Sequence, residues 1–600
     1  VEFISPGNTT VMKSAFAYAK AAGIPIGWMS NRPAGEYVGL GYSWANLSAA
    51  SYMSAEAGGK GTRTLEEFEK EGVALSVFNI DRQAGDGNAV YTTEAVDYYC
   101  SAAGRFKALC TNYPAWLIEK VEAAAKVYDG IRSEADLRAF AAEVAVDPTA
   151  KRFQNAAGEV VLHTDIAVSE AWTPIAGFAG VLDGNGKTLT VNYSGSDEQA
   201  GIFATLDGTV KNLRVAGSFT TTATAKVTLG AVAGKLGEKA QIVGCTNTAG
   251  IAMNVDASGT TVIGGIFGQG AAGNVIADNT NDGRITVRRK TPGDAAAVAG
   301  VGGWAYSDVT GCVNKGEIRY SDEVSAAKAV YVGGVLGRLD IGKGYVVEGC
   351  RNEAPVTLAT AQAANNLLGG IAAYANGENR DTPNTIRNCE NRGDVLADAP
   401  VSDKAKTGQA RMGGICGGTA VFEGNTNYGK VEARGGGKGA SEFSIGGISG
   451  MIAHDATGCR NFGDVLNNTG RENLLAHTGG LFGWATLAFT ITDCALDADV
   501  VSTTLYNYDG DKGTTADPAH ENSSCAGVLV GRIKSKIEVT VESVKIYGKL
   551  TRTINAEGQT RTIDFTTTVP ADNYLYGALQ DAASKLIVGQ GAITCVSTAK

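Results

Sequence analysis

The stretch Ile263-Gly-Gly-Ile-Phe-Gly268 recurs, with variation, through the middle of the chain. Further copies begin at Val332, Leu368, Met412, Ile445 and Thr478, and weaker copies occupy residues 229–234 and 299–303. A short Gly-rich motif that returns at a nearly constant interval is typical of repeat architectures, in which each repeat is one structural unit. The chain is therefore predicted to be built from repeats over most of its length.

A second motif, close to Cys-x-Asn-x-Gly, follows each copy of the first. Its first position is occupied in turn by Cys245, Asn279, Cys312, Cys350, Cys389, Asn425, Cys459 and Cys494, at intervals of 34, 33, 38, 39, 36, 34 and 35 residues. Because Asn replaces Cys twice, this position is predicted to be a buried structural column and not a set of metal ligands or disulfides. The asparagines two residues further on are expected to form an amide ladder, since Asn suits turns and can bond the repeats on either side. They are Asn247, Asn281, Asn314, Asn352, Asn391, Asn427 and Asn461.

Each repeat holds two or three short β-rich runs separated by Gly and Asn turns. No such run can bury both faces alone, but stacked repeats about 4.8 Å apart would pair every strand with its neighbours. We therefore predict a mainly β fold, a right-handed parallel β-helix that forms a solenoid of repeats about 35 residues long. One aliphatic position of the motif is expected to form an interior column of Ile266, Val335, Ile371, Ile415, Ile448 and Leu481. A β-propeller is the alternative, because a propeller blade also takes about 40 residues.

The predicted organisation has four parts. Residues 1–130 form a non-repeat module, α/β or mostly helical, with helices at 8–22, 64–72 and 114–126 and strands at 24–28 and 73–80. Residues 131–155 form a helical cap, because Ser133-Glu-Ala-Asp136 is a helix start and apolar residues follow at helical spacing. Residues 156–545 are the repeat array, and 546–600 hold the last repeats and a C-terminal cap near 574–584.

The composition bounds the function. The chain has 600 residues, of which 44% are hydrophobic and 19% charged, so it is globular. Its net charge is −10 and no segment concentrates Lys and Arg, which disfavours a nucleic-acid partner. No apolar run approaches the roughly 18 residues of a transmembrane helix, so no membrane span is predicted. No signal peptide is recognisable after Val1. Whether Cys100 and Cys110 form a disulfide stays open.

Several segments together resemble the GLUG-repeat surface proteins of gut Bacteroidetes. They are the predicted cap helix, Trp172-Thr-Pro-Ile175, the turn Leu182-Asp-Gly-Asn-Gly-Lys-Thr188 and the repeated Gly-Gly-(Ile/Leu)-x-Gly. The resemblance covers roughly residues 131–530. It implies an adhesin-like protein that is secreted, extracellular or exposed on the bacterial cell surface. Some members of the family are attached to peptidases, but no peptidase motif occurs in this chain.

One position of the repeat is a candidate ligand-binding column. The residue after the Gly-Gly motif is, in order, Lys235, Gln269, Trp304, Arg338, Tyr374, Gly418, Met451 and Trp484. Three of these eight are Trp or Tyr, against 7% aromatic residues in the whole chain. If Trp304, Arg338, Tyr374 and Trp484 face outward, sugar rings can stack on them. The alternative is that these rings pack beneath loops at a corner of the repeat.

Catalytic and metal sites are less well indicated. Polysaccharide-cleaving β-helices use acids on adjacent repeats, and Asp282, Glu317, Glu353, Asp394 and Asp464 lie near the Asn turn, where solvated turn acids are also expected. The four His residues are scattered, without metal-ligand spacing. A weak calcium site at Asp509 and Asp511 is conceivable, but Lys512 and Pro518 depart from the EF-hand pattern.

The leading hypothesis is a non-enzymatic adhesin or glycan-binding protein, with a glycan or a host or cell-surface protein as its partner. One alternative is a polysaccharide lyase or glycoside hydrolase with acids on adjacent repeats. The other is a structural subunit of a cell-envelope assembly that docks through residues 1–130.

Overall fold

The computed structural model describes residues 2–3, 10–48, 63–78, 80, 98–100, 102–111, 113–125, 128–255, 259–290, 294–322, 328–360, 365–376, 381–398, 409–435, 442–469, 475–503, 524–553, 560–580 and 583–597. Contacts divide the chain into two compact units, Val1–Val127 and Tyr128–Lys600.

The N-terminal unit is an α/β structure around a parallel sheet. Its five strands pair in chain order and are β1 (Glu2–Phe3), β2 (Gly27–Trp28), β3 (Trp44–Ser48), β4 (Ala74–Phe78) and β5 (Ala108–Leu109). Its helices are α1 (Thr10–Ala21), α2 (Ala34–Leu40), α3 (Leu65–Lys70), the 3₁₀ turn η2 (Ala103–Arg105) and α5 (Pro114–Ala125). The sequence analysis predicted α1, α3, α5, β2 and β4 and missed α2, β3 and the sheet that joins the strands.

The sequence Thr64-Leu-Glu-Glu67 has the pattern of a capping box, but at the start of α3 this box forms only in part. Thr64 Oγ1 accepts a hydrogen bond from the Glu67 N–H over 3.1 Å, as a helix cap does. The Glu67 carboxylate, however, accepts from the N–H of Ala34, the first residue of α2, over 2.9 Å. Glu67 thus ties two helices together instead of closing its own helix.

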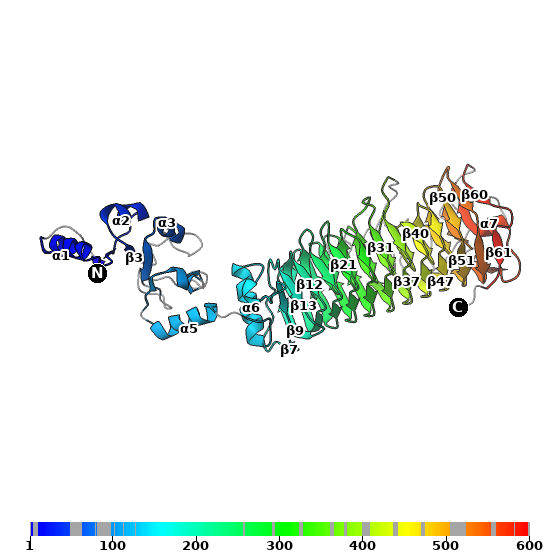
Figure 1. The fold of residues 1–600 in the computed structure, drawn as a ribbon. Helices are drawn as coiled ribbons and strands as arrows, with labels where there is room; N and C mark the ends of the chain where they lie inside the picture. The colour runs from blue at the N-terminus through cyan, green and yellow to red at the C-terminus, as the bar shows by residue number, and fades with distance from the viewer. Residues whose placement is uncertain are drawn as a thin grey trace. The chain divides into compact units, whose positions relative to one another are not determined.

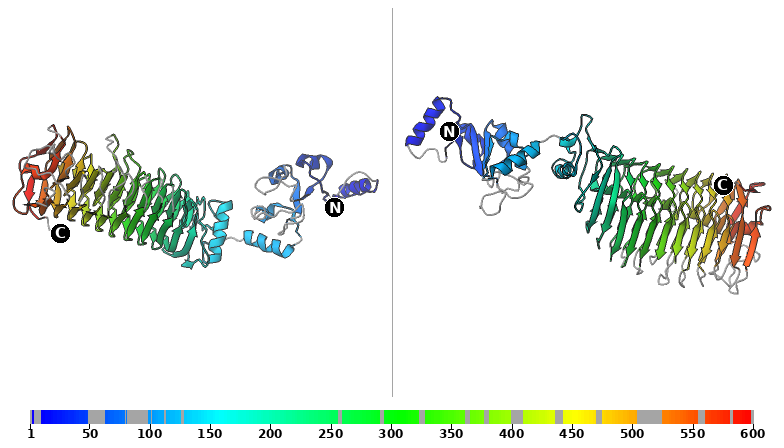
Figure 2. Two further views of the ribbon diagram at one scale, coloured as in Figure 1. Left: turned by 180° about the vertical axis from the view of Figure 1, so that it is seen from behind. Right: turned by 90° about the horizontal axis from the view of Figure 1, so that it is seen from below.

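The second unit is a stack of repeats that runs in chain order from α6 (Glu134–Val146) to the C-terminus (Figures 1 and 2). Nearly every strand pairs in parallel with the equivalent strand of the next repeat. The first sheet contains β10 (Gln199–Ala200), β14 (Val227–Gly230), β19 (Thr261–Gly264), β24 (Ala296–Ala299), β29 (Val330–Gly333), β34 (Asn365–Gly369), β39 (Gln409–Gly413), β43 (Glu442–Gly446), β48 (Leu475–Gly479) and β53 (Cys525–Gly527).

The second sheet follows directly after the first in each repeat. It contains β11 (Phe203–Leu206), β15 (Ala233–Leu236), β20 (Phe267–Gln269), β25 (Gly302–Ala305), β30 (Leu336–Leu339), β35 (Ala372–Tyr374), β44 (Ser449–Ile452), β49 (Phe482–Ala485), β54 (Val530–Ile533) and β59 (Tyr576–Leu579). Between β35 and β44 the sheet continues through single bridges from Ala372 to Cys416 and from Cys416 to Ser449.

The third sheet holds thirteen strands. They are β6 (Glu159–Val161), β8 (Val181–Asp183), β12 (Thr209–Lys211), β16 (Gln241–Val243), β21 (Val275–Ala277), β26 (Val309–Thr310), β31 (Val346–Glu348), β36 (Thr385–Arg387), β40 (Val421–Glu423), β45 (Ala456–Thr457), β50 (Phe489–Thr492), β55 (Glu538–Val541) and β60 (Lys585–Val588).

The fourth sheet has a short ladder and a long ladder, which merge near the N-terminal end in β9 (Thr188–Gly195) and β13 (Arg214–Thr221). The short ladder is β17 (Thr246–Asn247), β22 (Thr280–Asn281), β27 (Val313–Asn314), β32 (Arg351–Asn352), β37 (Glu390–Asn391), β41 (Thr426–Asn427), β46 (Arg460–Asn461), β51 (Cys494–Asp497), β56 (Val544–Tyr547) and β61 (Ile593–Cys595). The long ladder is β18 (Gly250–Val255), β23 (Ile285–Arg289), β28 (Ile318–Asp322), β33 (Val356–Thr360), β38 (Val395–Asp398), β42 (Val431–Arg434), β47 (Val465–Asn468), β52 (Val500–Ser502) and β57 (Lys549–Thr553). β7 (Ile166–Ala167) pairs with β9, and β58 (Thr560–Asp564) pairs antiparallel with β57.

The Gly-Gly motif forms the turn between the first and second sheets. A Cβ at the first glycine would overlap the carbonyl oxygen three residues later, as at Gly333 with Leu336. A Cβ at the second glycine would overlap both the backbone of the next repeat and the side chain of a ladder asparagine, as at Gly370 with Gly414 and Asn391. In most repeats a Cβ would overlap its neighbours at these positions, which favours glycine there. Ala299 takes the first position in one repeat, and Ala231 and Val528 take the second position in two others.

The amide ladder lies inside the stack. All seven asparagines of the ladder are fully buried. Each of the first six donates from Nδ2 to Oδ1 of the asparagine in the next repeat over 2.7–2.8 Å. Each Nδ2 also donates to the carbonyl oxygen two residues further along the chain, so these buried amides are satisfied. At the end of the ladder Leu496 takes the Asn position, and Asn461 donates to the Gly480 carbonyl over 3.0 Å instead.

The Cys and Asn positions of the second motif form a second interior column. All eight of these side chains, from Cys245 to Cys494, are buried. Where Asn replaces Cys, the side-chain amide both accepts and donates a hydrogen bond. Asn279 accepts from the Cys245 N–H and donates to the Ile242 carbonyl. Asn425 makes the same pair of bonds with Cys389 and Ile386. Either residue therefore fits the position, because both fill a small space beside backbone carbonyls.

Apolar helices and strands cover the ends of the stack. Helix α6 begins at Ser133, whose Oγ accepts from the Asp136 N–H, and it buries Phe140 against Phe178 with ring centroids 5.3 Å apart. Near the C-terminus, residues 576–579 form strand β59 of the second sheet, after the one-turn helix α7 (Asp572–Leu575). Part of the region predicted as a terminal cap therefore continues the repeat pattern.

The parallel pairing between successive repeats is compatible with the predicted β-helix. It differs from a propeller, whose blades are separate antiparallel sheets.

Replacing a ladder asparagine should destabilise the second unit. Asn352→Ala removes the partner of both Asn314 Nδ2 and Asn391 Oδ1 in a dry interior, which should lower the free energy of unfolding by about 3 kcal/mol. Asn192→Ala removes an exposed amide that accepts from Ser218 and should cost less than about 0.5 kcal/mol. Urea unfolding followed by circular dichroism measures both, and equal midpoints would contradict the ladder's role.

The turn at Gly370 should not tolerate an added methyl group. Gly370→Ala places a Cβ on the Gly414 carbonyl and on Asn391, and should lower the unfolding midpoint strongly or abolish folding. Gly250→Ala, at a strand position where a Cβ meets no atom within 4 Å, is the matched control and should be neutral or slightly stabilising. Thermal unfolding compares the two variants; a Gly370→Ala protein as stable as the control would show that the turn can relax.

Candidate functional site

The candidate ligand-binding column lies on the outer side of the second sheet. Strand pairing places Gln269 beside Trp304, Trp304 beside Arg338, and Arg338 beside Tyr374. Trp484 lies on β49, beside Met451 of β44. Trp304, Arg338, Tyr374 and Trp484 are each half-buried. The Tyr374 ring leans over Gly418, where a Cβ would lie 2.7 Å from the ring, so the glycine makes room for it.

A second outward column, from the first sheet, meets this one. It contains Tyr331, Leu367, Arg411, Ser444 and His477 on consecutive strands. The two columns are in contact: the Tyr331 and Tyr374 ring centroids are 5.6 Å apart, and those of His477 and Trp484 are 5.7 Å apart. We call the shared surface the aromatic–arginine strip and define it as Trp304, Tyr331, Arg338, Tyr374, Arg411 and Trp484.

The sequence analysis found the half of this strip that lies on the second sheet and missed the half on the first. The missed residues lie two positions before the first glycine of the Gly-Gly motif. Tyr331 precedes Val332-Gly-Gly in this way, and Arg411 precedes Met412-Gly-Gly. This fixed offset from the motif was a signal that could have identified them.

Arginine side chains lie between the aromatic rings of the strip. The Arg338 guanidinium carbon is 4.2 Å from the Trp304 ring centroid, 5.4 Å from that of Tyr331 and 5.8 Å from that of Tyr374. The Arg411 guanidinium carbon is 5.8 Å from the Trp484 ring centroid. Each contact is within the range of a cation–π interaction. The planes of rings and guanidinium groups thus form one surface across several repeats.

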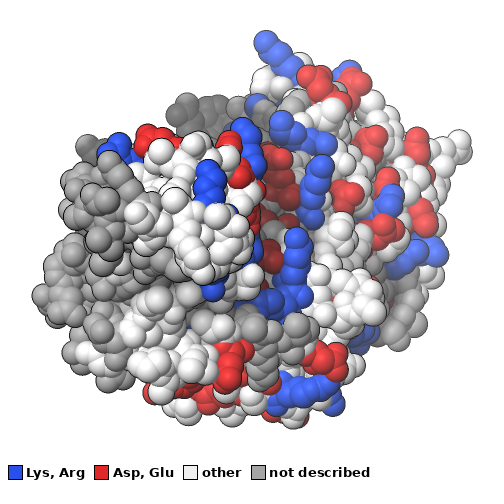
Figure 3. All heavy atoms as spheres, turned by 60° about the vertical axis from the view of Figure 1, so that its left-hand side comes forward, with Lys and Arg blue, Asp and Glu red and all other residues white. Residues whose placement is uncertain are grey.

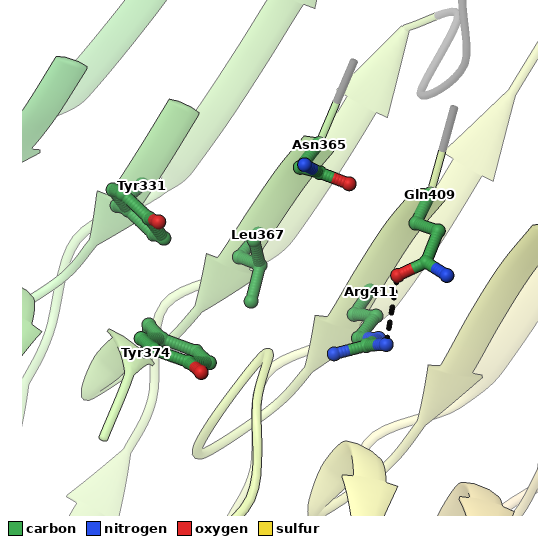
Figure 4. Close-up of a pocket in the computed structure, with 6 residues that line it drawn as sticks. All are labelled: Tyr331, Asn365, Leu367, Tyr374, Gln409 and Arg411. Carbon is green, nitrogen blue, oxygen red and sulfur yellow. Dashed lines mark hydrogen bonds between the residues drawn. The ribbon is translucent and has the colours of Figure 1, made fainter. Parts of the chain in front are cut away.

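A pocket of about 180 Å³ opens in the middle of the strip (Figure 4). It is lined by Tyr331, Asn365, Leu367, Tyr374, Gln409 and Arg411. Figure 4 shows that these side chains come from three neighbouring strands of the first sheet and one strand of the second, with Arg411 bonded to Gln409 over 2.9 Å. Two phenol rings, two amides and a guanidinium around one opening combine stacking faces with hydrogen-bonding groups, which is how polar ligands with apolar ring faces are bound.

His477 closes the strip beside Trp484 but is not arranged as a catalytic base. Its Nε2 lies 3.1 Å from Arg532, which can only donate, so Nε2 accepts and Nδ1 carries the proton. Nδ1 lies 3.2 Å from Ser444 Oγ and therefore donates to it. A base that activates a serine must accept from it, so this pair does not form an activated nucleophile. Burial, and then the charges of Arg532 and Arg411, hold the pKa of His477 well below its usual range.

The acids near the Asn turn serve structural roles in the structure. Asp394 accepts from the Lys430 N–H over 2.9 Å and Asp464 from the Asp499 N–H over 3.0 Å, each bracing the next repeat. Glu353 pairs with Arg351 and Glu317 with Arg284 at the surface.

A cluster of acids across repeats lies on the third sheet. Lys211 Nζ is 2.8 Å from Glu159 and 3.5 Å from Asp183. The hydrogen bond that Lys211 donates to Glu159 raises the pKa of Lys211, so the lysine stays protonated and cannot act as a base. This arrangement is that of an ion-pair network.

The side chains of the cysteine column are buried in the interior of the stack. Burial raises the pKa of Cys245 to about 12, so its thiol stays protonated. All eleven cysteine side chains are thiols in the structure, with Cys100 buried and Cys110 exposed. In the described ranges no three His, Cys, Asp or Glu side chains gather as metal ligands would. Asp509 and Asp511, the weak calcium candidates, lie outside the described residues.

Charged residues of both signs are mixed over the face drawn in Figure 3, where neither sign forms a continuous field. In the part of the chain that the structure describes, no helix is both long enough and apolar enough to cross a membrane.

Comparison of the chain with protein-family models, with curated proteins and with solved structures gives no match.

The buried His477 should make stability fall at acidic pH. Its folded pKa is depressed, so the folded state binds fewer protons than the unfolded state once the pH drops below the unfolded value of about 6.5. Wild type should therefore lose stability relative to His477→Gln between pH 7 and pH 5, by up to about 2 kcal/mol. Urea unfolding of both proteins at several pH values gives this difference. A difference that stays constant with pH would mean that His477 is not buried as a neutral side chain.

Proposed function

We propose that this protein binds glycans, without cleaving them, through the aromatic–arginine strip. The observation that carries the proposal is the alignment of Trp304, Arg338 and Tyr374 on adjacent strands, with the pocket beside them. Sugar rings present flat apolar faces between hydroxyl groups, and these suit a surface of aromatic rings bordered by amides and guanidinium groups. An extended strip, as opposed to a closed cavity, suits a polymer better than a single sugar.

The fold supports this proposal. We infer that the second unit is a right-handed parallel β-helix, in which one face can repeat the same side-chain position at each step of the stack. The handedness follows the general preference of parallel connections. A regular spacing of about 4.8 Å between neighbouring side chains of the strip follows from the strand pairing.

The cellular setting belongs to the proposal too. The resemblance to GLUG-repeat proteins supports a secreted or surface-exposed adhesin of a gut-type bacterium. The non-enzymatic part of the proposal rests on the arrangement of the described acids, which brace backbone N–H groups or pair with Lys and Arg.

A second candidate, docking to a protein of the cell envelope, is favoured by the N-terminal unit. Of the thirteen large hydrophobic side chains that are exposed among the described residues, five belong to its 127 residues: Tyr18, Ile24, Val38, Leu40 and Ile118. Exposed apolar side chains are frequent at protein interfaces.

Glycan binding should depend on the aromatic rings of the strip. On a polysaccharide array, wild type should bind at least one polymer, and Trp304→Ala/Tyr374→Ala should weaken that binding by about tenfold or more, because each stacked ring contributes on the order of 1 kcal/mol. Tyr547→Ala removes a 37% exposed ring of the fourth sheet and should leave binding unchanged.

The same samples, analysed for released oligosaccharides, test the absence of cleavage. Intact polymer is expected. Shortened polymer would overturn the non-enzymatic part, and equal loss of binding in Tyr547→Ala would remove the strip's special role.

A further inference from the structure

The charged residues of the strip are all basic, although the chain as a whole carries a net charge of −10. On the second sheet the outward column reads Thr205, Lys235, Gln269, Trp304, Arg338, Tyr374, Gly418, Met451, Trp484, Arg532 and Ala578. On the first sheet the meeting column reads Gln199, Thr228, Val262, Ala297, Tyr331, Leu367, Arg411, Ser444, His477 and Cys525. Neither column contains Asp or Glu. Within these two columns of an acidic chain, therefore, every charged side chain is basic. The neighbouring acid Asp340 lies outside both columns, and its charge and that of Arg338 both act on Tyr306.

Arg338 has no anionic partner among the described residues. It makes no hydrogen bond or ion pair with them, and its contacts are the three aromatic rings of Trp304, Tyr331 and Tyr374. Its Nε is buried without a hydrogen-bond acceptor, and so is the neighbouring Trp304 Nε1. A partly desolvated guanidinium without an acceptor is costly, and ring faces compensate this cost only in part. Arg338 therefore carries a positive charge that no acid of the described residues neutralises by an ion pair.

The neighbouring cations extend this pattern along the stack. Arg411 lies two repeats beyond Arg338, at a rise of about 10 Å, with Tyr374 and the pocket between them. Arg532 donates to His477, which burial and the arginine itself keep neutral. Aromatic and cationic side chains thus alternate from Trp304 through Arg338, Tyr374, Arg411 and Trp484 to Arg532.

We propose that the glycan held by the strip is an acidic one, a polymer whose sugars carry carboxylate groups. This inference rests on the proposed glycan-binding function and adds the chemical class of the ligand. The planar fork of a guanidinium matches the two oxygens of a carboxylate, and the pair is stronger where both groups are partly shielded from water. The aromatic rings stack on the sugar faces, and Arg338 selects the carboxylate at a fixed distance from them. A neutral glycan would leave the Arg338 guanidinium without an acceptor.

The test compares matched polymers that differ only in charge. Polygalacturonate, its fully methyl-esterified form and its carboxyl-reduced form are titrated by calorimetry into wild type and into Arg338→Gln, Arg338→Lys and Arg319→Gln. Arg319 is an exposed arginine on β28 in the fourth sheet, so its variant removes the same charge away from the strip. Dextran sulfate serves as a polymer that detects unspecific charge attraction.

Wild type and Arg319→Gln should bind polygalacturonate about tenfold or more tightly than either neutral form. Arg338→Gln should reduce this preference to less than about threefold and keep the weak binding of the neutral forms. Arg338→Lys, which keeps the charge without the planar fork, should give an intermediate preference.

The other outcomes show whether the preference for acidic glycans fails alone or together with glycan binding itself. Equal binding of charged and neutral forms by wild type, or an unchanged preference in Arg338→Gln, overturns the inference and leaves glycan binding in place. The inference is also overturned if wild type binds dextran sulfate more tightly than polygalacturonate and if Arg338→Gln and Arg319→Gln weaken that binding equally. Overall charge would then explain the binding of the acidic polymers. Binding of none of the polymers overturns both proposals.

Discussion

The close approach of the Gly-Gly turn to the asparagine ladder is the constraint on which the second unit depends. At this point the backbone of one repeat lies directly on the backbone of the next, and the ladder amides fill the space that remains. In the middle of the stack, as at Gly370 and Asn391, a Cβ at the turn overlaps the ladder, and a missing amide leaves buried polar groups without partners. The contact fixes the register of every repeat, and with it the position of each outward side chain.

This register creates the aromatic–arginine strip. Trp304, Arg338 and Tyr374 are 34 and 36 residues apart in the chain, yet they lie on adjacent strands because each stands at the same offset from a Gly-Gly turn. The turn also brings the outer sides of the first and second sheets together, so that Tyr331 and Arg411 reach the same surface. A rigid backbone thus positions the side chains, and no loop is needed to hold them. Such preorganisation lowers the entropy lost on binding.

Much of the architecture was predictable from the sequence because short recurring motifs determine it. The repeat interval, the Cys and Asn columns and the cap helix depend on local residue identity, and the structure has each where the sequence predicts it. Residues such as Tyr331 and Arg411 were missed because the residue at their position varies between Val, Tyr, Leu, Arg, Ser and His, so that only its fixed offset from the Gly-Gly motif marks the position. In the N-terminal unit, α2 was missed because the segment Ala34-Gly-Glu-Tyr-Val-Gly-Leu40 contains two glycines, which disfavour helices. There, Glu67 on a distant helix supplies the N-terminal bond, a tertiary contact that local sequence does not show.

The asparagine ladder also bears on how such a protein can evolve. Since the Asn–Asn bonds of the ladder join equivalent atoms of neighbouring repeats, recombination that inserts or deletes one whole repeat can restore the same bonds at the new junction. Only the two ends, with α6 and the final strands, must be retained. The outer columns meanwhile gain or lose one side chain at each such event. The length of the aromatic–arginine strip could therefore change by gene duplication alone, while the interior stays the same.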